Sequence, residues 1–163
     1  IRGGHNIDPK VIEEALALHP AVALSAAVGR PDEHAGEIPV AYVQLQQGAD
    51  ATEAGLGAFA AEHIAERAAI PRHIHIVDEL PQTAVGKTFK PALTLREVES
   101  VVREESVRCG AELVSVVVEQ DTRLGVVARC EVAGSGALQL QERLGGFTFT
   151  SVVQPLESGA APA

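Results

Sequence analysis

The run of residues 38–46 limits the folds open to this chain, because it is apolar on both faces of a strand. Alternate side chains fall on the two faces: Ile38, Val40 and Tyr42 on one, and Ala41, Val43 and Leu45 on the other. A strand of this kind is buried on both sides, as it is in the centre of a covered sheet. The run therefore predicts a layered α+β domain with this strand at its centre.

The elements predicted around this strand follow in the order helix, strand, strand, helix, strand. Asp8 is a suitable N-cap for the first helix, and Pro9 fits its first position. Either Asp50 or Thr52 caps the second helix. The predicted ranges are a helix from Pro9, a strand at 22–28, the central strand at 38–46, a helix at about 52–68 and a strand at 73–77. Together they predict a small three-stranded sheet flanked by helices.

The same order of elements starts again after the first helix–sheet unit, so we expect a second small α/β annex. Its predicted elements are a helix at 91–108, strands at 112–119 and 124–132, a helix at 137–144 and a strand at 147–153. We accordingly expect a first domain at 1–97, the annex at 98–154 and a disordered tail at 155–163. The two halves share an element order, but no repeat of matching residue types.

Composition excludes several classes of function. The net charge of −9 argues against a nucleic-acid surface, which needs clustered lysine and arginine. No apolar run approaches the roughly 18 residues of a membrane span, and no leader stands at the start, so a cytoplasmic protein is expected. Cys109 and Cys130 have no metal-ligand spacing and are expected to be buried and reduced. His73 and His75 lack a third ligand at a suitable spacing, so no metal site is predicted.

The most distinctive polar stretch runs from Pro81 to Lys87. Its composition predicts a loop, because a proline opens it, small residues follow, and Gly86 stands directly before the lysine. Glycine frees the backbone at that point, so the ammonium can be aimed from an exposed tip at phosphate or carboxylate oxygens. The simpler interpretation is a surface hairpin with a solvated lysine, and the motif alone does not decide between the two.

The start of the chain has two unusual features. Gly3 and Gly4 lie side by side in an otherwise extended stretch, which marks either the close approach of a ligand or backbone, or an ordinary turn. No methionine stands at position 1 or anywhere else in the sequence. We therefore expect the chain to be a fragment of a longer protein.

Three stretches fall in one order at consistent intervals and together resemble a known family. They are Gly3-Gly4-His5-Asn6-Ile7-Asp8-Pro9 with Ile12-Glu13, then Val28-Gly29-Arg30-Pro31-Asp32 with Gly36-Glu37, and then Pro81 to Lys87. This set resembles the C-terminal lid domain of the adenylate-forming enzymes, which include acyl-CoA synthetases, peptide-synthetase adenylation domains and luciferases. Within this group, the motifs most resemble those of fatty-acyl or medium-chain acyl-CoA synthetases. The resemblance covers about residues 1–97, and it departs at Val11, where the family often has Glu, and at Val85, where Thr or Ser is common.

The resemblance implies a two-step ligase with ATP and CoA as substrates. A fatty acid or another carboxylic acid attacks the α-phosphate of ATP to give an acyl-adenylate, and the CoA thiol then displaces AMP. Lys87 matches the lysine that bridges carboxylate and phosphate oxygens in the first step. Pro81, Thr83 and Gly86 match residues that position its loop. The resemblance also makes Lys87 a candidate for acetylation, which would remove its charge.

In the second step of such ligases the lid rotates, and a glycine-containing segment replaces the lysine loop. Gly3, Gly4 and His5 match positions along the pantetheine channel, and Arg72 stands where it could meet the nucleotide phosphates of CoA. The resemblance places Mg²⁺ in the large N-terminal domain, which is a partner missing from this sequence. The fragment alone is therefore expected to be inactive.

Two other interpretations stay open. The chain can be a free-standing module that senses a small ligand, or the lid of an adenylation domain that loads a carrier protein. A phosphate-binding loop several hundred residues upstream would favour the ligase, whereas a start codon just before Ile1 would favour the module. For residues 98–163 the sequence does not choose between homo-oligomerisation, cover for the lid and contact with the missing domain.

Overall fold

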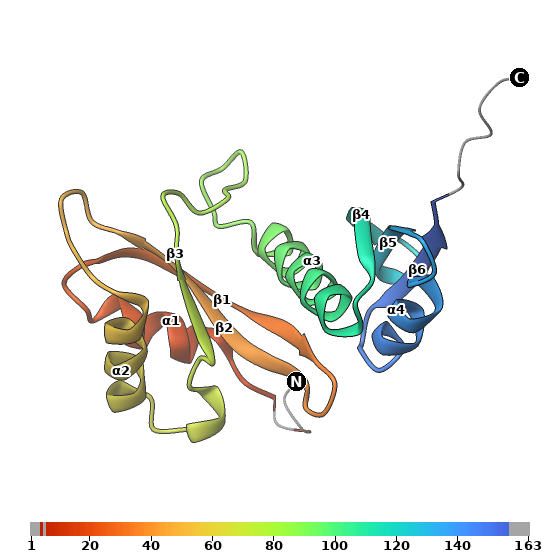
Figure 1. The fold of residues 1–163 in the computed structure, drawn as a ribbon. Coiled ribbons are helices and arrows are strands. Elements are labelled where there is room, and N and C mark those ends of the chain that lie inside the picture. The colour runs from red at the N-terminus through yellow and green to blue at the C-terminus, as the bar shows by residue number, and fades with distance from the viewer. Residues whose placement is uncertain (1–3, 5, 157–163) are drawn as a thin grey trace, which may run out of the picture. The chain divides into compact units, whose positions relative to one another are not determined.

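The computed structural model describes residue 4 and residues 6–156, which fall into the units Ile1–Thr94 and Leu95–Ala163. Most of the predicted tail, 157–163, lies outside the described residues. In chain order the elements are α1 (Pro9–Ala17), β1 (Val22–Asp32), β2 (Gly36–Leu45), α2 (Glu53–His63), a 3₁₀ turn (Arg67–Ala69), β3 (His73–Ile76), α3 (Lys90–Cys109), β4 (Glu112–Asp121), β5 (Gly125–Ala133), α4 (Ala137–Leu144) and β6 (Thr150–Pro155) (Figure 1). The predicted α+β class is confirmed, with two three-stranded mixed sheets and four α-helices in the described part.

The first sheet has the order β1-β2-β3, so the run that is apolar on both faces is its central strand. β2 pairs antiparallel with β1 and parallel with β3. On one face, α1 and α2 pack over a core that includes Leu16, Ala41 and Leu56. On the other face, Tyr42 packs with Leu80, in a second cluster. The prediction of a strand covered on both sides is confirmed.

Caps set the starts of the first two helices. Asp8 accepts a hydrogen bond from the Lys10 backbone N–H at 3.0 Å, and Pro9 is the first residue of α1, as predicted. The Thr52 hydroxyl accepts from the Gly55 N–H at 3.0 Å, so Thr52 is the cap of α2 and Asp50 is not.

Several predicted boundaries were wrong. The first strand, predicted at 22–28, continues to Asp32, and the last strand continues to Pro155, where the disordered tail was expected to begin. At two other boundaries the core overrode the local pattern. α2 ends at His63 and not near residue 68, because Ile64 turns to an extended conformation with a side chain only 4% exposed. The last strand begins at Thr150 and not at Phe147. Phe149 packs into the core of the second unit, so its apolar character reflects burial outside the strand.

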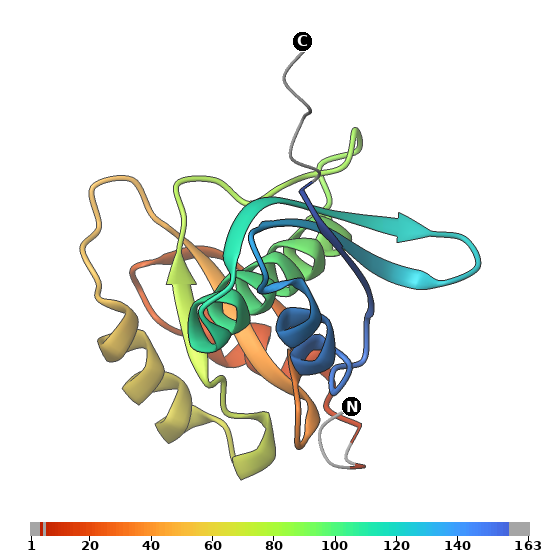
Figure 2. The same cartoon turned by 45° about the vertical axis from the view of Figure 1, so that its right-hand side comes forward.

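The second sheet has the order β4-β5-β6, again with one antiparallel and one parallel pair. Figure 2 shows its first two strands as a long hairpin. α3 and α4 contribute Val102 and Leu140 to a separate core. Glu105 of α3 is 2% exposed, and its carboxylate accepts a hydrogen bond from Arg143 Nε of α4 at 2.8 Å, which joins the two helices. Glu105 also pairs with Arg108 of its own helix.

The two units repeat one topology, although their residue types differ. Each hairpin turns at an aspartate whose carboxylate accepts two amide hydrogen bonds, followed by a glycine with positive φ: Asp32 with Gly36 at +77°, and Asp121 with Gly125 at +76°. In each case a backbone amide bond is the main reason why the pKa of the aspartate is lowered. The two units therefore share their order of elements, their strand pairing and their hairpin turn, and so form a structural repeat.

Both cysteines are free, but they differ in burial. Cys130 is buried as predicted, and burial raises the pKa of its thiol to about 11, which keeps it protonated. Cys109 is only half-buried, so the prediction was wrong for that residue. Among the described residues, no helix combines the length and apolarity that a membrane crossing needs.

Candidate functional site

Lys87 lies on a hairpin loop between β3 and α3 that is closed by its own backbone (Figures 1 and 2). At the base, the Phe89 N–H donates to the Pro81 carbonyl at 2.6 Å, and nearer the tip the Thr83 N–H donates to the Lys87 carbonyl at 2.7 Å. The loop predicted from composition is therefore present, and its backbone is closed as a hairpin.

The tip of the loop presents Lys87 to solvent. Gly86 has a φ of +76°, a conformation that favours glycine, and its N–H donates to the Thr83 carbonyl at 2.9 Å. The Lys87 N–H donates to the Thr83 hydroxyl at 3.2 Å. Lys87 itself is exposed, and the neighbouring Val85 side chain is 81% exposed. The ammonium is thus free to meet an anion that approaches from outside this unit.

Both ends of the loop are anchored in the first unit. Before the loop, Leu80 is buried, and its N–H donates to the Gln44 side-chain oxygen at 3.1 Å. After the loop, the Lys90 ammonium lies 2.7 Å from Glu13 Oε1. None of Glu13, Gln44 and Lys90 was among the predicted site residues. Gln44 carried a signal, since it directly follows the apolar run 38–43 of the central strand.

The glycine segment leads directly into α1. Gly4 is exposed with a φ of +89°, and a Cβ placed on it would meet nothing within 4 Å. Gly3 and His5, which were predicted with it, lie outside the described residues. Backbone freedom is therefore what the structure requires of Gly4, since its φ is one that L side chains rarely adopt.

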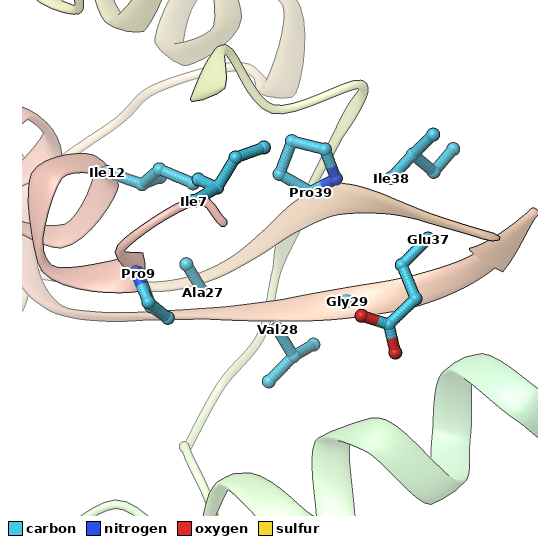
Figure 3. A pocket seen from close by; sticks show the side chains of 9 residues that line it. All are labelled: Ile7, Pro9, Ile12, Ala27, Val28, Gly29, Glu37, Ile38 and Pro39. Carbon is cyan, nitrogen blue, oxygen red and sulfur yellow. The ribbon is translucent and has the colours of Figure 1, made fainter. Parts of the chain in front are cut away.

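A pocket of about 150 Å³ lies beside this segment, and Figure 3 shows its side chains. It is lined by Ile7, Pro9, Ile12, Ala27, Val28, Gly29, Glu37, Ile38 and Pro39. A Cβ at Gly29 would lie 2.8 Å from the Glu37 carboxyl group, so glycine lets that side chain lie across β1. The pocket is smaller than typical ligand sites of about 300–1,000 Å³.

Arg72 lies in a different place, on the surface beside β3. It lines two surface pockets, of about 270 and 350 Å³, and shares the larger with Arg67. The pKa of Asp32 is lowered mainly by the Ala35 amide, and the charge of Arg72 adds a smaller effect. These two pockets share no lining residue with the pocket beside Ile7.

The predicted histidine pair lies on one face of β3, with ring centroids 6.4 Å apart for His73 and His75. The His75 ring also lies 4.9 Å from the Tyr42 ring. Within the described ranges, no three His, Cys, Asp or Glu residues are grouped so that they could hold a metal ion.

Comparison with known proteins assigns the class. Residues 11–87 match the AMP-binding enzyme C-terminal domain family. The marinolic acid–CoA ligase of Pseudoalteromonas sp. (strain SANK 73390) is 49% identical over 104 residues, which cover 64% of this chain and 16% of that protein. The long-chain-fatty-acid–CoA ligase of Bacillus subtilis (strain 168) is 40% identical over 100 residues, 61% of this chain and 18% of that protein. The crystal structure of ATP-bound MatB from Rhodopseudomonas palustris matches with a TM-score of 0.54 and 33% identity, over 58% of this chain and 18% of that chain.

These residues belong to the AMP-binding enzyme C-terminal domain family. The match confirms the resemblance to the C-terminal domain of adenylate-forming enzymes that the sequence motifs indicated, and both curated relatives that share this domain are named as CoA ligases. The chain spans less than a fifth of the length of the two curated relatives.

Proposed function

We propose that this chain acts as the lid of an AMP-forming acyl-CoA ligase and that Lys87 is its catalytic residue in adenylate formation. The observation that carries the proposal is the exposed ammonium of Lys87 at the tip of a closed hairpin. Membership of the family supports it. The substrate proposed is a fatty acid or another carboxylic acid, in keeping with the names of the relatives.

In the first step, a carboxylate oxygen forms a bond to the α-phosphorus of ATP, and the bond from that phosphorus to the pyrophosphate oxygen breaks. Two anions must approach each other, and negative charge gathers around the phosphorus. The Lys87 ammonium bridges the carboxylate and phosphate oxygens and stabilises this charge. No step uses a metal bound by the described residues; Mg²⁺ is proposed to bind in the large domain, with the phosphates of ATP.

In the second step, the CoA sulfur forms a bond to the acyl carbon, and AMP leaves. The lid rotates as a rigid body, so that the Gly4 segment takes the place of the lysine loop. Gly3, Gly4 and His5 line the pantetheine channel, and the positive φ of Gly4 suits a backbone that passes close to the ligand. Arg72 binds the nucleotide phosphates of CoA.

The isolated chain is expected to give no ATP–pyrophosphate exchange, because the ATP and acyl pockets lie in the proposed large domain. The measurement compares the isolated chain, the complete ligase and a reaction without protein, with the carboxylic acid present. Exchange by the complete ligase alone supports the proposal. Exchange by the isolated chain at a comparable rate would show that the chemistry does not need a second domain.

Replacing Arg72 by alanine in the complete ligase is expected to raise the KM for CoA by about 10-fold or more, since a hydrogen bond to a charged group contributes roughly 1.5–3 kcal/mol. The KM for ATP, measured by pyrophosphate exchange, should stay unchanged. Arg123→Ala is the control, since Arg123 is an exposed arginine in the β4–β5 turn. An unchanged KM for CoA in Arg72→Ala would remove Arg72 from the CoA site.

A further inference from the structure

The Glu13 carboxylate sits where three elements of the first unit meet. Its Oε1 atom accepts a hydrogen bond from the Ala27 N–H of β1 at 2.8 Å, and the same atom lies 2.7 Å from the ammonium of Lys90. Glu13 belongs to α1, and Lys90 is the first residue of α3. Since β1 is an edge strand, the carboxylate caps an edge amide and joins α1 to the start of α3.

Lys90 directly follows the hairpin that carries Lys87. The hairpin closes at the bond between Phe89 and Pro81, so Lys90 is the next residue after the closed loop. On the other side of the loop, Leu80 is held by Gln44. The hydrogen bonds described within the loop close it on itself, so its direction relative to the sheet depends on contacts outside it. These contacts include the two just described and the burial of Leu80 and Leu93 against the sheet.

We propose that Glu13 and Lys90 are positioning residues, whose ion pair fixes the direction in which the hairpin presents Lys87; this rests on the function proposed above. The pair also joins the two segments that the lid uses in turn, because the helix that carries Glu13 begins directly after the Gly4 segment. Loss of the pair should tilt the hairpin while leaving its internal hydrogen bonds in place.

A role in positioning differs measurably from a role in stability. The side chains of Lys90 and Glu13 are 39% and 23% exposed, and ion pairs with this much solvent contribute little to folding. The adenylation rate is more sensitive to the position of Lys87, because a displacement of about 1 Å in a catalytic group can lower the rate by up to roughly 100-fold. The pair should therefore affect the adenylation rate far more than the unfolding temperature.

The first test is Lys90→Ala in the complete ligase, which leaves the bond between Glu13 and Ala27 in place. We expect the kcat of adenylate formation to fall about 10-fold or more, and thioester formation from a preformed adenylate to stay within about threefold. The unfolding midpoint should stay within about 2 °C of the parent. Lys90→Arg should restore most of the rate. Lys10→Ala is the matched control, since Lys10 is an exposed lysine of α1.

The second test removes the negative charge of the ion pair. Glu13→Gln keeps an acceptor for the Ala27 amide and should reproduce the loss seen in Lys90→Ala, whereas the exposed neighbour changed in Glu14→Gln should have no effect. The double variant of Glu13 and Lys90 should be no slower than either single variant, because the two side chains act through one interaction.

Additive losses in the double variant, or equal losses in both half-reactions, would overturn the positioning role. So would an adenylation rate in Lys90→Ala equal to that in Lys10→Ala. A Lys87→Ala variant measured alongside separates the two proposals. If it loses adenylation while Lys90→Ala does not, only the positioning role fails; if Lys87→Ala retains adenylation, the proposed function itself fails.

Discussion

Replacing Lys87 by alanine in the complete ligase is expected to lower the kcat of adenylate formation by about 10²–10³-fold, the typical effect of removing one preorganised donor from developing charge. ATP–pyrophosphate exchange measures this step. Thioester formation from a preformed adenylate should stay within about threefold, because the lysine has left the reaction centre in the second step of the proposed mechanism.

The controls for this variant follow from the small number of lysines. Lys10 and Lys90 are the only others in the sequence, and Lys10→Ala should leave both half-reactions unchanged. Lys87→Gln, which resembles the acetylated side chain in charge, should match Lys87→Ala. Equal loss of both half-reactions in Lys87→Ala would argue for a structural defect and against a role in adenylation alone.

Leu140→Ala is expected to lower the unfolding free energy of the second unit by about 2–5 kcal/mol, the usual cost of truncating a fully buried leucine. Leu140 is 0% exposed and packs in the core that α3 and α4 form with the second sheet. Hydrogen exchange of the amides in β4 and β5 reports this free energy directly.

The same helix provides the control for this variant. Leu138 lies two residues earlier in α4 with a side chain 76% exposed, so Leu138→Ala should change the free energy by less than about 0.5 kcal/mol. Equal losses in the two variants would show that the burial of Leu140 does not set the stability of this unit.

Local rules predicted the parts of the fold whose cause is local. Asp8 and Pro9 start α1, Gly86 adopts a positive φ, and the central strand lies at Gly36–Leu45, close to its predicted range. Each of these features depends on a cap, a turn residue or an apolar pattern that neighbouring residues define.

The end of α2 could not be predicted in this way. The alanine- and glutamate-rich residues after His63 favour a helix by propensity, and so the prediction ran too far. Ile64 and Ala69 are both buried in the same core as α1, and the chain leaves the helix to bring them there. Tertiary packing decided this boundary.

The same distinction between local features and tertiary contacts applies to the candidate site. The loop that carries Lys87 was evident from composition, because glycine and proline set loop geometry over a few residues. The contact between Glu13 and Lys90 joins residues far apart in the sequence and depends on how α1 and α3 meet at β1. In the sequence Glu13 stands out only as part of a motif, and nothing local points to its partner.

The closed backbone of the 81–89 hairpin has a consequence for a lid that moves. A loop that became ordered only against its target would lose conformational entropy each time it docked. This hairpin is ordered by bonds between its own residues, so that cost is met once, when the domain folds. The ammonium can then leave and return as part of a rigid body, and repeated use of the loop requires no refolding.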